Sequence, residues 1–177
     1  LAFLLIQREA SAAERSFLAS QGQISVAATL RAMALTGDGR RALVELKAVD
    51  SAYPLYGKVA LDPDQPLAAA LAQRDGAYGA VVDSTLLARL DLAPGARLNI
   101  GSAAIEVRAI LRTEPDKLAS GIGFGPRVIV SEAALRATGL LQPGSLVRWI
   151  YRMKLADSSD RAERAVTAAA GAQLPDA

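Results

Sequence analysis

Three kinds of segment in this sequence carry side chains that catalytic sites use. The first, Val81–Leu86 (VVDSTL), places a carboxylate beside two hydroxyls, as in the Asp-Thr/Ser-Gly loop of aspartic proteases. That chemistry needs two carboxylates that share a proton, so it would require a second copy of the segment or a dimer, and a glycine in place of Thr85. We therefore predict that Asp83 or Ser84 caps the helix that follows.

The second segment, Gly121–Gly125 (GIGFG), has the glycine content of a phosphate-binding loop. Such loops join a strand to the N-terminus of a helix, whereas Pro126 and an apolar strand follow here. We predict a surface loop. A Ser/Lys nucleophilic pair is a further possibility, but the lysines lie in predicted loops or on polar strand faces with no sign of burial: Lys47, Lys58, Lys117 and Lys154.

Carboxylate pairs are the third kind of segment. Asp62 with Asp64, and Glu114 with Asp116, lie in predicted loops and could bind calcium weakly, but they lack the dense oxygen-ligand spacing of a calcium loop. The chain has no cysteine and no histidine, which removes thiolate chemistry, the commonest general base and the commonest transition-metal ligands. We assign no catalytic, cofactor-binding or metal-ligating residue and expect no cofactor.

The amino-acid composition of the chain argues against further classes of protein. The 177 residues include 51% hydrophobic side chains, enough for a core, and the net charge is +2. Basic residues are spread along the chain and aromatics make up 5%, which disfavours nucleic-acid binding.

The apolar run Leu1–Ile6 is far shorter than the ~20 residues that span a bilayer. It has no signal-peptide flanks, and the chain does not begin with Met. We expect a soluble fragment of a longer protein.

The N-terminal part predicts a β-α-β-β order. Ser11 and Glu14 form a capping box, and Gly22 stands where a left-handed helix end is expected. Alternating apolar residues predict strands on both sides of the turn at Thr36–Gly39. The predicted elements are a strand at residues 1–8, apolar enough to be central in its sheet, a helix at 12–20 and strands at 24–31 and 41–49.

The middle of the chain is mixed, and the end returns to a β-α pattern. Short elements follow Tyr53: a helix ending near Gly76, a strand at 79–82, a helix at 84–90, a hairpin over 98–111, a strand at 127–131 and a helix from the Ser131 cap to Gly139. The last strand turns Val147, Trp149, Tyr151, Met153 and Leu155 to one face, and Arg148, Arg152 and Lys154 to solvent. Asp157 or Ser158 then caps a final helix that runs to about Ala170.

These patterns predict an α+β fold in which residues 1–52 and 144–177 form one part and residues 53–143 form an inserted, β-rich part with short helices. Four segments carry a family resemblance: LVELKAVDSAYPLYG, DLAPGARLNIGSAAIEVRAILRTEPD, GPRVIVSEAALRATGLLQPGS and VRWIYRMKL. Within them, the most specific residues are Glu45–Val49 with Tyr53-Pro54-Leu55, Glu114-Pro115-Asp116, and Thr138-Gly139 with Gln142–Ser145. Ala96 stands where the family commonly has Asp.

These segments resemble the periplasmic (MacB-like core) domain of FtsX/MacB-superfamily ABC transporter permeases, most closely the lysophospholipase-related (arylesterase-associated) transport systems. The resemblance implies a porter-like βαββ…βα subdomain made from both chain ends, with a β-rich subdomain inserted. Val44–Gly57 would then be the crossover between them, with Tyr53 and Tyr56 packed in the joint.

The resemblance also implies a function. It implies a non-catalytic domain on the periplasmic side of the bacterial inner membrane, within a membrane-embedded parent. That domain binds a periplasmic partner or an amphiphilic or lipoprotein substrate. It also couples mechanically to ATP hydrolysis in a separate nucleotide-binding subunit. Two alternatives stay open: a free-standing periplasmic binding or chaperone module, and a hydrolytic domain that uses Asp83 or a serine.

Overall fold

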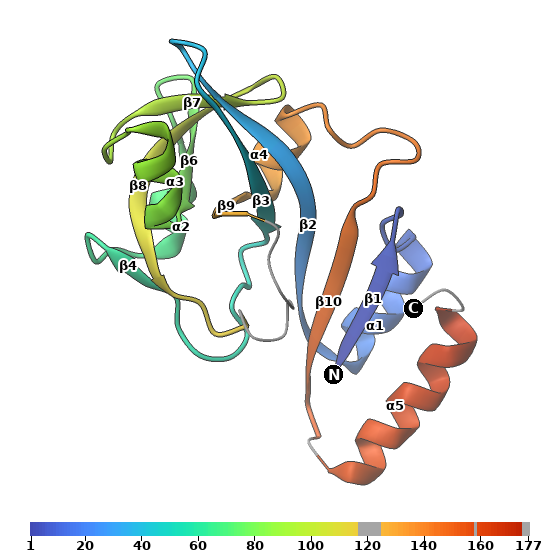
Figure 1. Cartoon of the computed structure of the whole chain (residues 1–177). Coiled ribbons are helices and arrows are strands. Elements are labelled where there is room, and N and C mark those ends of the chain that lie inside the picture. Colours follow the sequence, from blue (N-terminus) through green and yellow to red (C-terminus); the bar gives the residue numbers. More distant parts are fainter. Residues whose placement is uncertain (117–124, 158, 175–177) are drawn as a thin grey trace.

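The computed structural model describes residues 1–116, 125–157 and 159–174, and Figure 1 shows their arrangement. The strands are β1 (Ala2–Ile6), β2 (Gly22–Thr36), β3 (Arg41–Val49), β4 (Ala60–Asp62), β5 (Gln73–Arg74), β6 (Ala77–Val82), β7 (Arg97–Ile100), β8 (Ala103–Thr113), β9 (Arg127–Ser131) and β10 (Arg148–Leu155). The helices are α1 (Ala12–Gln21), α2 (Leu67–Leu71), α3 (Ser84–Leu90), α4 (Glu132–Ala137) and α5 (Asp160–Gln173).

The strands join into one sheet with the order β1-β10-β2-β3-β9-β6-β8-β4. Strand β7 pairs with both β2 and β8, so β2, β3, β9, β6, β8 and β7 close into a ring of paired strands. Alternation along β3 turns Val44, Leu46 and Ala48 into the core inside this ring. The opposite face of β3, which carries Glu45 and Lys47, lies outside it.

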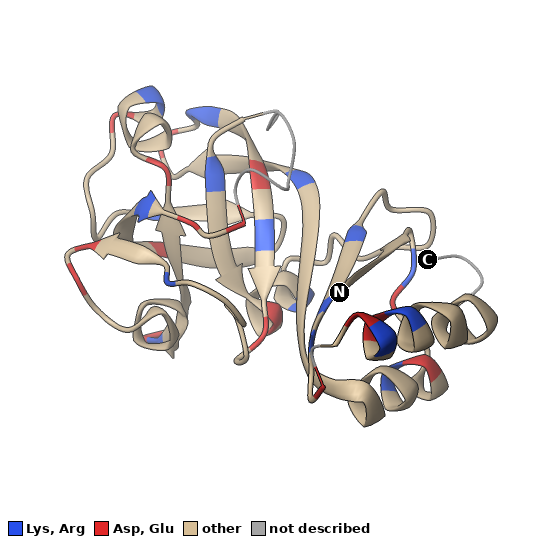
Figure 2. Cartoon of the chain, turned by 90° about the horizontal axis from the view of Figure 1, so that it is seen from below, with Lys and Arg blue, Asp and Glu red and all other residues tan. Residues whose placement is uncertain are grey.

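Helices α1 and α5 lie side by side on one face of β1 and β10, as both views show (Figures 1 and 2). The predicted capping box begins α1: the Ser11 hydroxyl accepts from the Glu14 amide, and the Glu14 carboxylate accepts from the Ser11 amide. Leu5, Leu18 and Tyr151 are buried between the helices and the sheet. The β-α-β-β order of the chain start is therefore confirmed.

Three details of the predicted terminal elements are wrong. The first strand, β1, is an edge strand and not a central one, because it pairs with β10 alone among the described strands. Gly22 has an extended backbone with φ of 164° and already belongs to β2, so it is not a left-handed helix end. The cap of α5 is Ser159, whose hydroxyl accepts from the Ala162 amide, and the helix runs on to Gln173.

In the middle of the chain, α3 and the β7–β8 hairpin form as predicted, and Asp83 caps α3 by accepting from the Thr85 amide at 2.9 Å. Ser131 caps α4 in the same way. Helix α2 is shorter than its alanine-rich sequence suggests, and the chain returns through β5 to pair with β6. Gly79 permits this return, because a Cβ there would overlap the carbonyl oxygen of Ala70.

Strands from both predicted parts belong to one hydrogen-bonded sheet, in which β3 and β9 run parallel. The division into residues 1–52 with 144–177 and residues 53–143 stays a prediction. Across the described residues, no helix combines the length and the apolar character needed to cross a membrane.

Candidate functional site

The candidate functional site is built around a buried lysine, Lys47. Lys47 lies on the outer face of β3, and its side chain is 2% exposed. This corrects the prediction that Lys47 lies on a polar, solvated strand face. The other lysines that the structure describes, Lys58 and Lys154, are exposed as expected, and Lys117 lies outside the described residues.

The segment after β8 covers Lys47 and supplies its counter-ions. The Lys47 ammonium donates to both oxygens of Asp116 at 2.8 Å and makes a short ion pair with Glu114 Oε1. Tyr53 closes the group: its hydroxyl accepts from Lys47 Nζ at 2.9 Å and donates to Asp116 Oδ1 at 2.7 Å. Glu114 and Asp116 are therefore ion-pair partners of a lysine, and not the calcium ligands considered above. Among the described residues, no cluster suited to a metal ion is present.

Two arginines extend the group to neighbouring strands. Arg127 of β9 contacts Glu45 of β3 at 2.9 Å and Glu114 at 3.6 Å, and Arg152 of β10 contacts Asp116 at 3.3 Å. The side chain of Arg152 is 28% exposed, so the predicted solvent-facing row of Arg148, Arg152 and Lys154 is interrupted at its middle residue. We call Glu45, Lys47, Tyr53, Glu114, Asp116, Arg127 and Arg152 the charge cluster.

The charge cluster is balanced, with three cations against three carboxylates. Burial raises the pKa of Asp116, but the Lys47 ammonium and the Tyr53 hydroxyl outweigh this and lower it to about 2. Burial and the Glu114 and Asp116 charges raise the pKa of the Tyr53 hydroxyl. Tyr53 therefore stays a neutral donor. Because the charged groups bind one another, the arrangement favours a structural role over catalysis.

The other predicted candidates lie apart from the charge cluster. Asp83 caps α3, as proposed. Asp62 forms a surface ion pair with Arg112. The glycine-rich segment lies mostly outside the described residues. Of the two tyrosines expected to pack in the joint, Tyr53 is buried and Tyr56 is 58% exposed, so Tyr56 is not packed as expected, and the joint itself stays a prediction.

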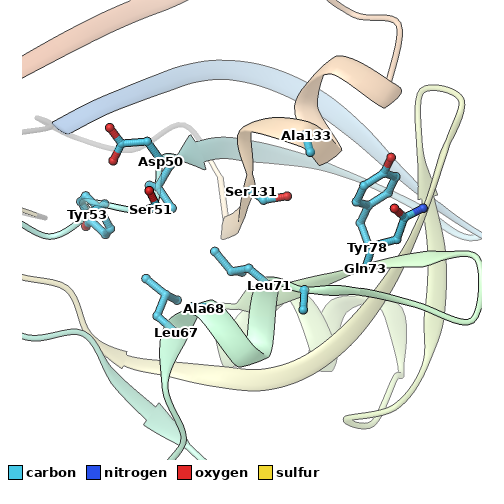
Figure 3. Close-up of a pocket in the computed structure, with 12 residues that line it drawn as sticks. Asp50, Ser51, Tyr53, Leu67, Ala68, Leu71, Gln73, Tyr78, Ser131 and Ala133 are labelled. Carbon is cyan, nitrogen blue, oxygen red and sulfur yellow. The ribbon is translucent and has the colours of Figure 1, made fainter.

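An apolar pocket of about 280 Å³ adjoins the charge cluster (Figure 3). It lies between the end of β3, helix α2, and the junction of β9 with α4. Tyr53 lines this pocket while its hydroxyl remains in the charge cluster. The pocket could not be predicted from the sequence, because its walls come from segments that are about 20 to 80 residues apart.

No established family profile matches this chain. In sequence it is similar to the uncharacterized ABC transporter permease YbbP of Escherichia coli (strain K12), with 30% identity over 124 residues. That similarity covers 70% of this chain and 14% of YbbP, so the chain spans a small fraction of the length of this relative.

In structure it is similar to the extracellular domain of the noncanonic ABC-type transporter YknZ from Gram-positive bacteria, with a TM-score of 0.56, 13% identity, and coverage of 96% of this chain and 95% of that one. It is also similar to the periplasmic region of MacB from Actinobacillus actinomycetemcomitans, with a TM-score of 0.55, 12% identity, and coverage of 96% and 82%. The predicted α+β fold is thus confirmed, and it is the fold of the YknZ extracellular domain and the MacB periplasmic region.

We expect Lys47→Met to destabilise the chain by about 3–5 kcal/mol, because it leaves Glu114 and Asp116 buried without their cation. Urea denaturation followed by circular dichroism measures the free energy of unfolding. Lys58→Met, at an exposed lysine, is the matched control and should change it by less than about 0.5 kcal/mol. Equal effects of the two substitutions would contradict a buried ion pair at Lys47.

Acid should remove the contribution of Asp116. Its folded pKa of about 2 lies below the ordinary value of 3.8, so its stabilisation is complete above pH 3.8 and is lost as the pH falls through about 2. The free energy of unfolding of the wild type should therefore exceed that of Asp116→Asn at pH 5 by a margin that shrinks toward pH 2. Glu14, whose pKa is also lowered to about 2 by hydrogen bonds from Arg8 and Ser11, contributes equally to both proteins and cancels in this comparison. A margin independent of pH would show that Asp116 is not held ionised by the charge cluster.

Proposed function

We propose that this chain is the extracytoplasmic domain of an ABC transporter permease and that it acts without catalysis of its own. The observation that carries this proposal is the similarity to the permease YbbP over 124 residues. The fold supports it, because the YknZ domain is the extracellular domain of an ABC-type transporter and the MacB region is periplasmic.

The domain would lie on the periplasmic side of the inner membrane, in a parent that belongs with the lysophospholipase-related permeases. A separate nucleotide-binding subunit would hydrolyse ATP. The domain itself would bind a periplasmic partner or an amphiphilic or lipoprotein substrate and transmit movement between that ligand and the membrane.

The charge cluster is suited to such transmission. Lys47 and Arg152 come from residues 1–52 and 144–177, the proposed porter-like subdomain, whereas Glu114, Asp116 and Arg127 come from the proposed insert. Buried ion pairs tolerate little change in geometry, because separating the partners leaves a charge without compensation. The two subdomains would therefore move as one body when either is pulled.

The membrane topology can be tested in the full-length parent after its native cysteines have been replaced by serine. This chain contributes none, so a single Leu146→Cys, at a side chain that is 74% exposed, gives a unique label site. Spheroplasts treated with a membrane-impermeant maleimide should label Leu146→Cys without lysis. The matched control Ile129→Cys, at a fully buried position, should label only after denaturation.

Each alternative gives a different result. Labelling of Leu146→Cys that requires lysis would place the domain in the cytoplasm and contradict the proposal. Release of the whole protein by osmotic shock would instead identify the free-standing periplasmic module.

A further inference from the structure

The pocket beside Tyr53 has walls that suit an aliphatic chain. Val49, Leu67 and Leu71 contribute branched side chains, and Ala68, Ala72 and Ala133 complete the surface. Several lining residues, including Ser51, Gln73 and Ala133, are exposed, so the pocket opens to solvent. Its volume of about 280 Å³ is close to the lower end of the ~300–1,000 Å³ range of ligand sites, which suits a short chain or the end of a longer one.

Polar groups lie at one end of the pocket. Figure 3 shows the side chains of Gln73 and Tyr78 next to each other, at the end away from Tyr53. Neither the Tyr78 hydroxyl nor the Gln73 amide makes a side-chain hydrogen bond to another residue that the structure describes. Together they offer donors and acceptors to a neutral polar group.

The described residues that line the pocket offer no cation to an anionic ligand. Asp50 is the one charged residue among the described residues that line it. Its carboxylate accepts from the Val26 amide at 2.6 Å, the Ser25 hydroxyl at 2.9 Å and the Ala52 amide at 3.1 Å. Among the residues that the structure describes, no lysine or arginine lines the pocket to receive a carboxylate or phosphate.

We infer that this pocket binds the aliphatic chain of a small non-ionic amphiphile, whose hydroxyl or amide head hydrogen-bonds to Tyr78 and Gln73. The chain replaces water along the apolar wall, which stabilises the complex in proportion to the apolar surface removed from water. Tyr53 links this site to the charge cluster, because its side chain contacts the ligand while its hydroxyl is held by Asp116. The inference concerns this chain alone and does not depend on the side of the membrane on which it lies.

Hexanamide and hexanoate are matched probes, since they share an aliphatic chain and differ in the charge of the head. Titration of the ¹⁵N-labelled chain with hexanamide should shift the amide signals of Leu71, Gln73 and Tyr78 in a saturable way. Hexanoate should bind at least about tenfold more weakly, because its carboxylate would leave water without meeting a cation among the described residues that line the pocket. Tyr78→Phe should weaken hexanamide several-fold, through the loss of one hydrogen bond.

Ala68→Phe, at an exposed position on α2 beside the pocket, should fill the site and abolish the shifts, whereas Ala169→Phe, at an exposed position on α5, should leave them unchanged. If Ala68→Phe loses the dispersed spectrum of a folded protein, Ser51→Trp at the pocket rim replaces it. The inference is overturned if hexanamide causes no saturable shift up to its solubility limit, if the folded blocking variant binds as the wild type does, or if hexanoate binds equally well. None of these results bears on the maleimide labelling of the parent, so the two proposals can fail separately.

Discussion

A lysine ammonium buried on a central strand has to be neutralised, and this requirement fixes how the covering segment meets the sheet. Lys47 is surrounded by β2 and β9, neither of which offers it a carboxylate in register. Glu114 and Asp116 supply the carboxylates, and they lie 67 and 69 residues after Lys47 in the chain. Because an unpaired buried charge is costly, moving the segment after β8 away from β3 would leave Lys47 without compensation.

The closed ring of strands and the charge cluster stabilise different regions of the fold. Inside the ring, apolar side chains from both predicted parts form one core. Outside it, the charge cluster joins β3, β9 and β10 to the segment after β8, and a smaller apolar group beside it includes Tyr53, Leu71 and Ile129. The pocket lies at the border of these two outer regions. A ligand there would contact the one residue, Tyr53, that belongs to both.

Much of the local structure follows from the sequence, because it depends on short-range chemistry. The capping box at Ser11 and Glu14, the Asp83 and Ser131 caps and the two-residue period of β3 all form as predicted. The burial of Lys47 could not be predicted this way, since alternation assigns it to the face opposite the ring core and says nothing of a cover contributed by a distant segment. One signal in the sequence did point to these residues. Two of the segments that carry the family resemblance contain Lys47 with Tyr53, and Glu114 with Asp116.

The central claim is that Lys47 and Glu114 stabilise the fold as a pair, and a double-mutant cycle tests it most directly. The free energy of unfolding would be measured for the wild type, Lys47→Met, Glu114→Gln and the double variant. We predict that the double variant is more stable than the sum of the single losses implies, by at least about 1 kcal/mol, because the second substitution removes a charge that the first leaves uncompensated. Losses that add to within about 0.3 kcal/mol would show that the two side chains act independently and would contradict the account.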